Sequence, residues 1–195
     1  MKRRGYEEVE RLYTDEELKM VIGYYLVDYW RHLNVRRYSE VNNAFDFFIR
    51  DERGKVAIVD MIEEEVFSIE GRKVLDVGCG KGGLIISCAL RGADAIGIDV
   101  DPTELRIAKL RAQKVGDVNL QLILCSAGFL PFRSSLFDLV TATSVLEHVD
   151  NPERAVREMV RVLKSDGYIF ITGPNPSFPR EAHYKFFIFH IYQRS

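Results

Sequence analysis

The sequence lacks an excess of charge of either sign and lacks any long apolar run. Its 27 basic and 29 acidic residues nearly cancel, so no global field would attract the protein to nucleic acid or to an anionic membrane. No apolar run approaches the ~20 residues that a membrane-spanning helix needs. Glu7, Glu8 and Glu10 follow the basic start where a secretory signal would place its apolar region. These absences favour a cytoplasmic protein with a small-molecule partner, and they count against nucleic acid and membrane partners.

Cysteine and histidine are too few and too scattered for a disulfide framework or a metal site. Cys79, Cys88 and Cys125 lie inside apolar runs and lack the paired spacing of zinc ligands. We expect all three to be reduced thiols that pack in a core. His32 and His190 have no partners at metal-ligand spacing, so we infer no metal.

The pattern of apolar residues divides the chain near Gly71. Before it, apolar residues recur at helical spacing, and helices are expected over about 14–30, 39–50 and 54–67. We interpret residues 1–70 as an N-terminal helical segment. Most of its aromatic side chains should be packing residues, while a minority would line a substrate pocket as a cap. Residues 71–195 form the second unit.

After Gly71, short β-branched runs alternate with helical segments about a dozen residues long. This alternation is typical of βαβ units and a parallel sheet. The fold class is therefore α/β, with a Rossmann-like parallel sheet of about five strands and helices on both faces. The predicted strands are Lys73–Val77, Ala95–Asp99, Leu120–Leu124, Phe137–Thr141 and Tyr168–Thr172.

Helix boundaries in this part are marked by capping residues and glycines. Asp101 and Asn151 each precede a proline, which is typical of an N-cap followed by proline at the first helical position. Gly92, Gly116 and Gly167 stand where a helix should stop or the chain should turn.

A glycine-rich loop follows the first predicted strand. Gly78, Gly80 and Gly83 give the pattern G-x-G-x-x-G between a strand and a helix, which is the context of a dinucleotide-type site. Asp99 ends the second strand, where a carboxylate can accept both ribose hydroxyls. These features suit NAD and S-adenosylmethionine equally.

Asp76, two residues before the glycines, distinguishes the two cofactors. NAD would place a pyrophosphate beside this carboxylate, at a cost on the order of several kcal/mol in a partly desolvated cleft. The amino group and sulfonium of S-adenosylmethionine would instead be attracted. Lys81 favours a phosphate-bearing cofactor, because a lysine in the loop could contact phosphate. We give it little weight, since an ammonium at a helix start is expected to reach solvent.

Five segments, spread over about residues 72–176, together resemble the class I S-adenosylmethionine-dependent methyltransferases, of a small-molecule methyltransferase type. Their order and spacing follow the order of that family's motifs. The segments are VLDVGCG at 74–80, GID at 97–99, LPF at 130–132 with FDLV at 137–140, VLEHV at 145–149 and RVLKSDGY at 161–168.

The resemblance implies S-adenosyl-L-methionine as the cofactor and assigns residues to it. The glycine loop would hold the methionine end and Asp99 the ribose, while residues after the third and fourth strands would flank the adenine and the reaction centre. Many family members carry an acidic residue at Ser126 that accepts from the adenine amino group, so the neutral Ser126 predicts weaker cofactor binding. The implied contacts are Asp76, Gly78, Cys79, Gly80, Asp99, Val100, Ser126, Ala127 and Thr143.

His148 is the candidate general base, because it follows the fourth strand at the carboxyl edge where ligands of open α/β sheets bind. Its alternative role is to shape the turn or pack against the cofactor. Methyl transfer is an in-line displacement at a sulfonium, so alignment and desolvation are the protein's main contributions. His183 and Tyr184 would follow the fifth strand on the same edge, either near the acceptor or as surface and packing residues.

The predicted function is transfer of a methyl group to an oxygen, nitrogen or carbon of a small-molecule acceptor. The alternatives are an NAD(P)-dependent oxidoreductase and a non-catalytic S-adenosylmethionine-binding subunit. Only 22 residues follow Gly173, which implies a shortened C-terminal sheet edge. That edge would be covered by residues 181–193 or by another subunit, or the chain is a truncated form of a longer protein. An uncovered edge favours a homo-oligomer formed through it or through the N-terminal helices.

Overall fold

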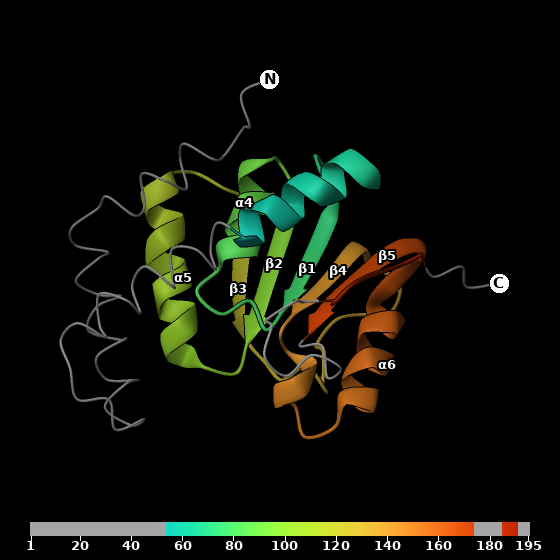
Figure 1. Cartoon of the computed structure of the whole chain (residues 1–195). Helices are drawn as coiled ribbons and strands as arrows, with labels where there is room; N and C mark the ends of the chain where they lie inside the picture. The colour runs from blue at the N-terminus through green and yellow to red at the C-terminus, as the bar shows by residue number, and fades with distance from the viewer. Residues whose placement is uncertain (1–53, 174–184, 191–195) are drawn as a thin grey trace.

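A single sheet of six strands organises residues 54–173 and 185–190, the part of the chain that the computed structural model describes (Figure 1). The strand order is β3-β2-β1-β4-β5-β6, with β1 to β5 parallel and β6 antiparallel to β5. The strands are β1 (Lys73–Val77), β2 (Asp94–Asp99), β3 (Leu120–Leu124), β4 (Phe137–Thr143), β5 (Leu163–Gly173) and β6 (Lys185–His190).

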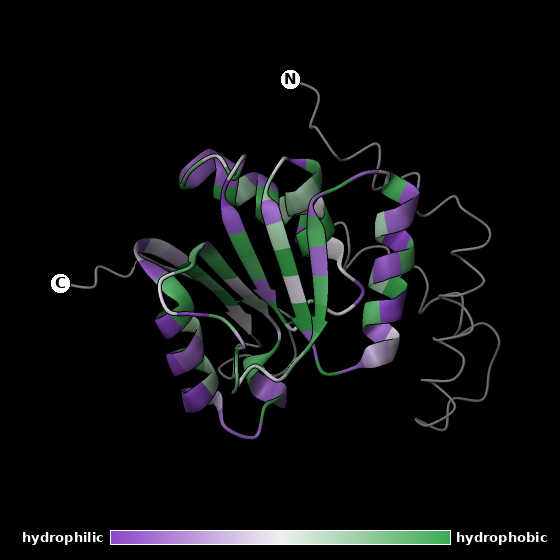
Figure 2. Cartoon of the chain, turned by 180° about the vertical axis from the view of Figure 1, so that it is seen from behind, coloured by the Kyte–Doolittle hydropathy of each residue, from purple (hydrophilic) through white to green (hydrophobic). Residues whose placement is uncertain are grey.

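Helices cover both faces of this sheet. A helix over 54–65 lies on one face with α4 (Gly83–Leu90) and α5 (Pro102–Val115), and α6 (Pro152–Val162) lies on the other. Two apolar cores result, one on each side, which explains why the central strands β1, β2 and β4 are buried along most of their length. Figure 2 shows the apolar residues concentrated on these strands.

The amphipathic pattern of α6 explains how it packs. Its three buried residues, Ala155, Met159 and Val162, recur at spacings of four and three and so share one face. Both predicted helix starts are confirmed. Asp101 Oδ1 accepts from Thr103 N (2.7 Å), and Asn151 Oδ1 accepts from Arg154 N (2.9 Å).

The predicted Rossmann-like arrangement is confirmed, with differences at the strand ends. β2 begins one residue earlier than predicted, β4 continues to Thr143, and β5 begins directly after α6. Gly167 therefore ends no helix and lies in a bulged part of β5, where residues 163–168 run beside residues 137–139 of β4. A Cβ at Gly167 would lie 2.8 Å from Leu163 Cδ1 and 3.0 Å from Asp138 O, so close packing requires glycine there.

The C-terminal edge of the sheet carries one more strand than predicted. The covering comes from within the predicted segment 181–193, because residues 185–190 pair with β5 as β6. The helices predicted over 14–30 and 39–50, and the proposed cap, lie outside the described residues. Within the described ranges no helix is long and apolar enough to span a bilayer, and no group of three or more potential metal ligands occurs.

Asp138 joins three neighbouring strands at the edge opposite the carboxyl ends. Its carboxylate accepts from Lys73 N (2.9 Å) in β1 and from Lys164 Nζ (2.8 Å) in β5, with Arg72 Nη1 3.5 Å away. Burial acts to raise the pKa of Asp138, but these hydrogen bonds and the charges of Lys164 and Arg72 outweigh it. The pKa of Asp138 is therefore below its usual value.

Replacing Asp138 with Asn should lower the free energy of unfolding by about 1–3 kcal/mol at neutral pH, because a charged acceptor is lost. A depressed folded-state pKa contributes stability above the unfolded-state pKa, and that stability is lost as pH falls through the folded value. The difference between the two proteins should thus shrink below about pH 4. Urea unfolding at several pH values measures it.

Asp166→Asn is the matched control, since Asp166 is exposed in β5 and its carboxylate makes no hydrogen bond or ion pair to another described residue. Equal and pH-independent losses in the two variants would contradict the role assigned to Asp138.

Candidate functional site

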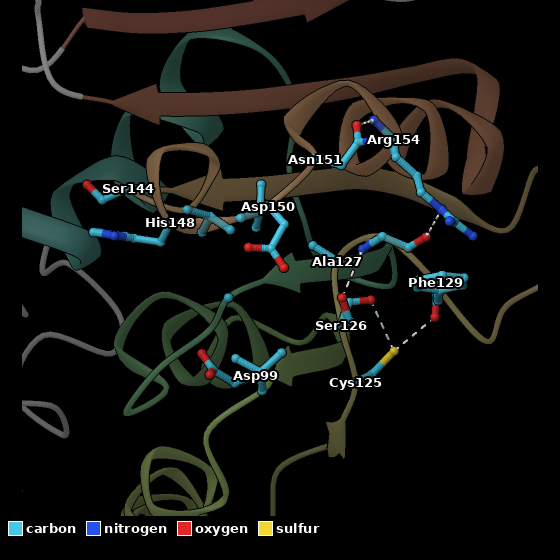
Figure 3. A pocket seen from close by; sticks show the side chains of 15 residues that line it. Asp99, Cys125, Ser126, Ala127, Phe129, Ser144, His148, Asp150, Asn151 and Arg154 are labelled. Carbon is cyan, nitrogen blue, oxygen red and sulfur yellow. Dashed lines mark hydrogen bonds between the residues drawn. The ribbon is translucent and has the colours of Figure 1, made fainter.

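A cavity of about 480 Å³ opens at the carboxyl ends of β1 to β4 (Figure 3). The strand order reverses here, since β2 and β4 lie on either side of β1, and ligands of open α/β sheets bind at such a reversal. The segments that follow β1, β2, β3 and β4 all contribute to its walls. The lining residues are Gly78, Asp99, Val100, Cys125, Ser126, Ala127, Gly128, Phe129, Ser144, Val145, His148, Val149, Asp150, Asn151 and Arg154.

Gly78 brings the loop after β1 against the segment after β4. Its φ of +69° is in the left-handed region, which favours glycine. A Cβ at this position would lie 2.5 Å from Val145 Cγ2. The loop can therefore close this side of the cavity only if residue 78 carries no side chain.

Asp99 fixes the glycine loop to the end of β2. Its Oδ2 accepts from Gly80 N (2.8 Å), and its Oδ1 accepts from Asp101 N (2.9 Å). Each carboxylate oxygen has two lone-pair directions, so one on each oxygen is not used by these two bonds. Because Asp99 also lines the cavity, it can accept from two ligand hydroxyl groups.

Asp76 lies beneath the loop and does not line the cavity. It is 1% exposed, and its Oδ1 accepts from Thr141 Oγ1 (2.7 Å) on β4. Its negative charge still acts on the loop. The pKa of the Cys79 thiol is raised mainly by burial and, as the next contribution, by the charge of the Asp76 carboxylate. Asp76 can therefore influence a ligand through its charge, but its side chain does not form part of the cavity wall.

Three further predicted cofactor contacts also lie outside the cavity lining. Cys79 is buried against Gly97, where a Cβ would approach its Sγ to 2.8 Å. Gly80 contributes through the amide that holds Asp99, and Thr143 ends β4 just before the lining residue Ser144. The predicted residues that do line the cavity are Gly78, Asp99, Val100, Ser126, Ala127 and His148.

Lys81 corrects an expectation, because its ammonium does not simply reach solvent. Its Nζ lies 2.9 Å from Glu104 Oε1, and both side chains are mostly buried. Arg111 on α5 donates from Nη1 to Lys81 O (2.5 Å). The loop is thus tied to α5, and the Lys81 charge is paired with Glu104 instead of facing a ligand.

Cys125 also departs from the prediction that all three cysteines pack in the core. Cys79 and Cys88 are buried, but Cys125 is half-buried and lines the cavity. Its Sγ donates to Phe129 O (3.1 Å). Burial, with the charge of Glu158, raises the pKa of the Cys125 thiol, so it stays protonated at neutral pH.

The wall formed by Phe129 and Arg154 was not predicted. The Arg154 guanidinium lies 3.4 Å from the centre of the Phe129 ring, and its Nε donates to Gly128 O (2.9 Å). Figure 3 shows this pair at one end of the cavity. The available sequence signal was Phe129, an aromatic residue just before the segment at 130–132. Its partner Arg154 is 25 residues away in the chain, so only the fold shows that the two are in contact.

The charges that face the cavity are mainly negative. Asp99 and Asp150 contribute carboxylates, while Arg154 is the one arginine or lysine among the described lining residues. Its guanidinium is engaged by Phe129 and Gly128. The site therefore favours a ligand that carries positive charge and hydrogen-bond donors over one that carries phosphates.

His148 lies in the short 3₁₀ helix η1 (Leu146–His148), and its side chain is exposed on the cavity wall. Its backbone N–H donates to Val145 O (2.9 Å), which fixes the turn. Figure 3 shows the imidazole at the end of the cavity near Ser144, away from the Phe129 end. His183 and Tyr184 lie outside the described residues.

Comparison with known proteins gives one family and a consistent fold. Residues 75–171 match a methyltransferase domain family. The ubiquinone biosynthesis O-methyltransferases of Chromobacterium violaceum and Pseudomonas putida strain W619 are 39% and 38% identical over 120 and 118 residues, each match covering 60% of this chain and 50% of the relative. The chain thus spans about half the length of the curated relatives it matches.

Solved structures show the same architecture. The YcgJ protein from Bacillus subtilis aligns with a TM-score of 0.57 at 29% identity, covering 63% of this chain and 51% of that one. The [4+2]-cyclase SpnF aligns with a TM-score of 0.56 at 31% identity, covering 60% and 44%. These matches agree with the family resemblance found in the sequence.

Replacing Gly78 with Ala should weaken binding of S-adenosylhomocysteine at least about tenfold, because the left-handed φ becomes strained and the methyl group displaces Val145. Adding Val145→Ala should restore part of the affinity, since it removes the overlap but not the strain. Isothermal titration calorimetry measures both effects.

Gly54→Ala is the control, because Gly54 has open space around its Cα and no left-handed φ. A folded Gly78→Ala protein that binds as tightly as wild type would contradict the role of this loop.

Proposed function

Residues 75–171 belong to the class I S-adenosylmethionine-dependent methyltransferases, and on this premise we propose that the chain transfers a methyl group from that cofactor to a small-molecule acceptor. The observation that carries the proposal is the cavity at the carboxyl ends of β1 to β4, in which Asp99 both fixes the glycine loop and faces the ligand space.

The side chains and backbone of the cavity fit S-adenosylmethionine. Asp99 would hold the ribose through the lone pairs left by Gly80 N and Asp101 N. Val100 is 68% exposed despite being apolar, and would cover one face of the adenine. Gly78 and Ser144 would border the methionine end, with the buried charge of Asp76 beneath them favouring a cation.

The same features count against a nicotinamide dinucleotide. A pyrophosphate needs cations or free helix-terminal amides near the glycine loop. Here Lys81 is paired with Glu104, and Gly80 N donates to Asp99. Two carboxylates that face the cavity would repel phosphate at close range. These contacts support the cationic cofactor over the oxidoreductase alternative.

When bound, S-adenosylmethionine supplies an activated methyl group on a sulfonium. The chain's own residues then contribute alignment and exclusion of water. His148, at the Ser144 end of the cavity, is placed to accept the proton of an acceptor that arrives protonated. The named relatives are O-methyltransferases, which supports oxygen as the first acceptor atom to test.

A second candidate function is chemistry other than methyl transfer, or binding of the cofactor without catalysis. The likeness to a [4+2]-cyclase at 31% identity favours different chemistry, because a protein of the same fold is named for another reaction.

Binding and turnover assays separate these functions. S-adenosylhomocysteine at about 100 times its Kd should stabilise the protein by about 2.7 kcal/mol, while NADH should leave the melting temperature unchanged. Radiolabelled S-adenosylmethionine with a panel of small hydroxyl- and amino-bearing acceptors should yield S-adenosylhomocysteine and methylated product in equal amounts. Stabilisation by NADH alone would reject the proposal, and binding without turnover on any acceptor would favour the second candidate.

Replacing His148 with Asn should lower kcat by about 10²-fold or more and flatten the acid limb of its pH profile, because a proton acceptor is lost. Cofactor affinity should stay within about threefold of wild type. Glu147→Gln is the neighbouring control, since Glu147 is exposed and does not line the cavity. An unaltered pH–rate profile in the His148 variant would remove the base role and leave a role in shaping the turn.

A further inference from the structure

Asp150 is a charged residue of the cavity wall that the fold does not use. It lies between η1 and α6, its side chain is exposed, and it makes no hydrogen bond or ion pair to another described residue. Figure 3 shows its carboxylate pointing into the cavity toward the side formed by Asp99 and Ser126. A carboxylate placed in this way is available to a ligand.

The neighbours of Asp150 on the same wall are already engaged. Asn151 Oδ1 caps α6 by accepting from Arg154 N (2.9 Å). The Arg154 guanidinium lies over Phe129 and donates to Gly128 O. Of the polar side chains in this part of the wall, Asp150 is therefore the one that the local structure leaves unused.

The opposite wall lacks an anionic acceptor for the adenine amino group. Ser126 Oγ accepts from Gly128 N (3.3 Å) within its own loop and is neutral. Asp99 Oδ1 and Oδ2 accept from the two backbone amides, and the proposed function assigns their remaining lone pairs to the ribose. Adenine presents two N–H donors on its exocyclic amine, and a charged acceptor binds such donors about twice as strongly as a neutral one.

We propose that Asp150 recognises the adenine of the cofactor by accepting a hydrogen bond from its 6-amino group. The carboxylate would thus act from the η1–α6 side of the cavity, in place of one at position 126. This inference rests on the proposed function, because it assumes that the cavity binds S-adenosylmethionine. The neutral Ser126 alone predicts weaker cofactor binding, whereas Asp150 would give the site a preference for adenine over a base that lacks the 6-amino group.

Base selectivity is measured with two ligands that differ at one group. S-adenosylhomocysteine carries the 6-amino donor, whereas S-inosylhomocysteine carries a 6-oxo acceptor that a carboxylate would repel. Isothermal titration calorimetry on the full chain should show that wild type prefers the adenine ligand by at least about tenfold. In Asp150→Asn the preference should fall below about threefold, because an amide can donate to the oxo group or accept from the amine.

Two further variants make the result specific to Asp150. Asp117→Asn removes an exposed carboxylate that does not line the cavity, and should keep the wild-type preference. Asp150→Asn combined with Ser126→Asp places a carboxylate on the other wall and should restore the preference for adenine. Asp150→Ser serves as the second single variant, with melting temperatures recorded for every protein.

Each outcome decides between the claims. An Asp150→Asn or Asp150→Ser protein that binds S-adenosylhomocysteine and keeps the full base preference overturns the role of Asp150 while leaving the proposed function intact. A folded wild type that binds neither ligand overturns the proposed function itself. Unchanged base preference with a lowered kcat/KM for the acceptor would assign Asp150 to the acceptor and likewise overturn adenine recognition.

Discussion

The carboxylate of Asp99 accepts two backbone N–H groups, and the geometry of the site depends on these two bonds. One comes from Gly80 in the loop after β1 and the other from Asp101, the N-cap of α5. A single side chain thereby fixes the loop, the strand end and the helix start relative to one another. Arg111 and Glu104 hold the same loop from α5 through Lys81. This arrangement presents Asp99 to the cavity already oriented, so little conformational freedom is lost when a ligand binds.

The distribution of charge around the loop connects the fold to the choice of cofactor. Asp76 is buried beneath the loop, Asp99 and Asp150 face the cavity, and the nearby Lys81 is paired with Glu104. Phosphate groups would meet mainly negative charge here, whereas a sulfonium and an amino group would be attracted. The cofactor supplies the reactive methyl group, so the protein's task is to align two molecules and exclude water. A cavity at the strand reversal with preorganised walls is suited to that task.

Features that depend on local sequence could be predicted, and features that depend on distant contacts could not. Strands of β-branched residues and helices that begin at Asp101 and Asn151 follow from short-range patterns, and the structure contains them. Gly78 and Asp99 were predicted from a motif whose spacing reflects a strand, a tight turn and a helix. The pairing of Lys81 with Glu104 and the contact of Arg154 with Phe129 join residues more than 20 positions apart, so no local pattern reveals them. Asp76 was assigned to the ligand from its position two residues before the glycines, and that position alone does not show that its side chain is buried and bonded to Thr141.

We propose that the cavity at the carboxyl ends of β1 to β4 binds S-adenosylmethionine through Asp99. A crystal structure of the full chain with S-adenosylhomocysteine measures this most directly. We predict both ribose hydroxyls within hydrogen-bond distance of the Asp99 carboxylate, with the base between Val100 and Ala127 and the sulfur at the Ser144 end. A ligand bound outside this cavity, or one whose ribose makes no contact with Asp99, would contradict the claim.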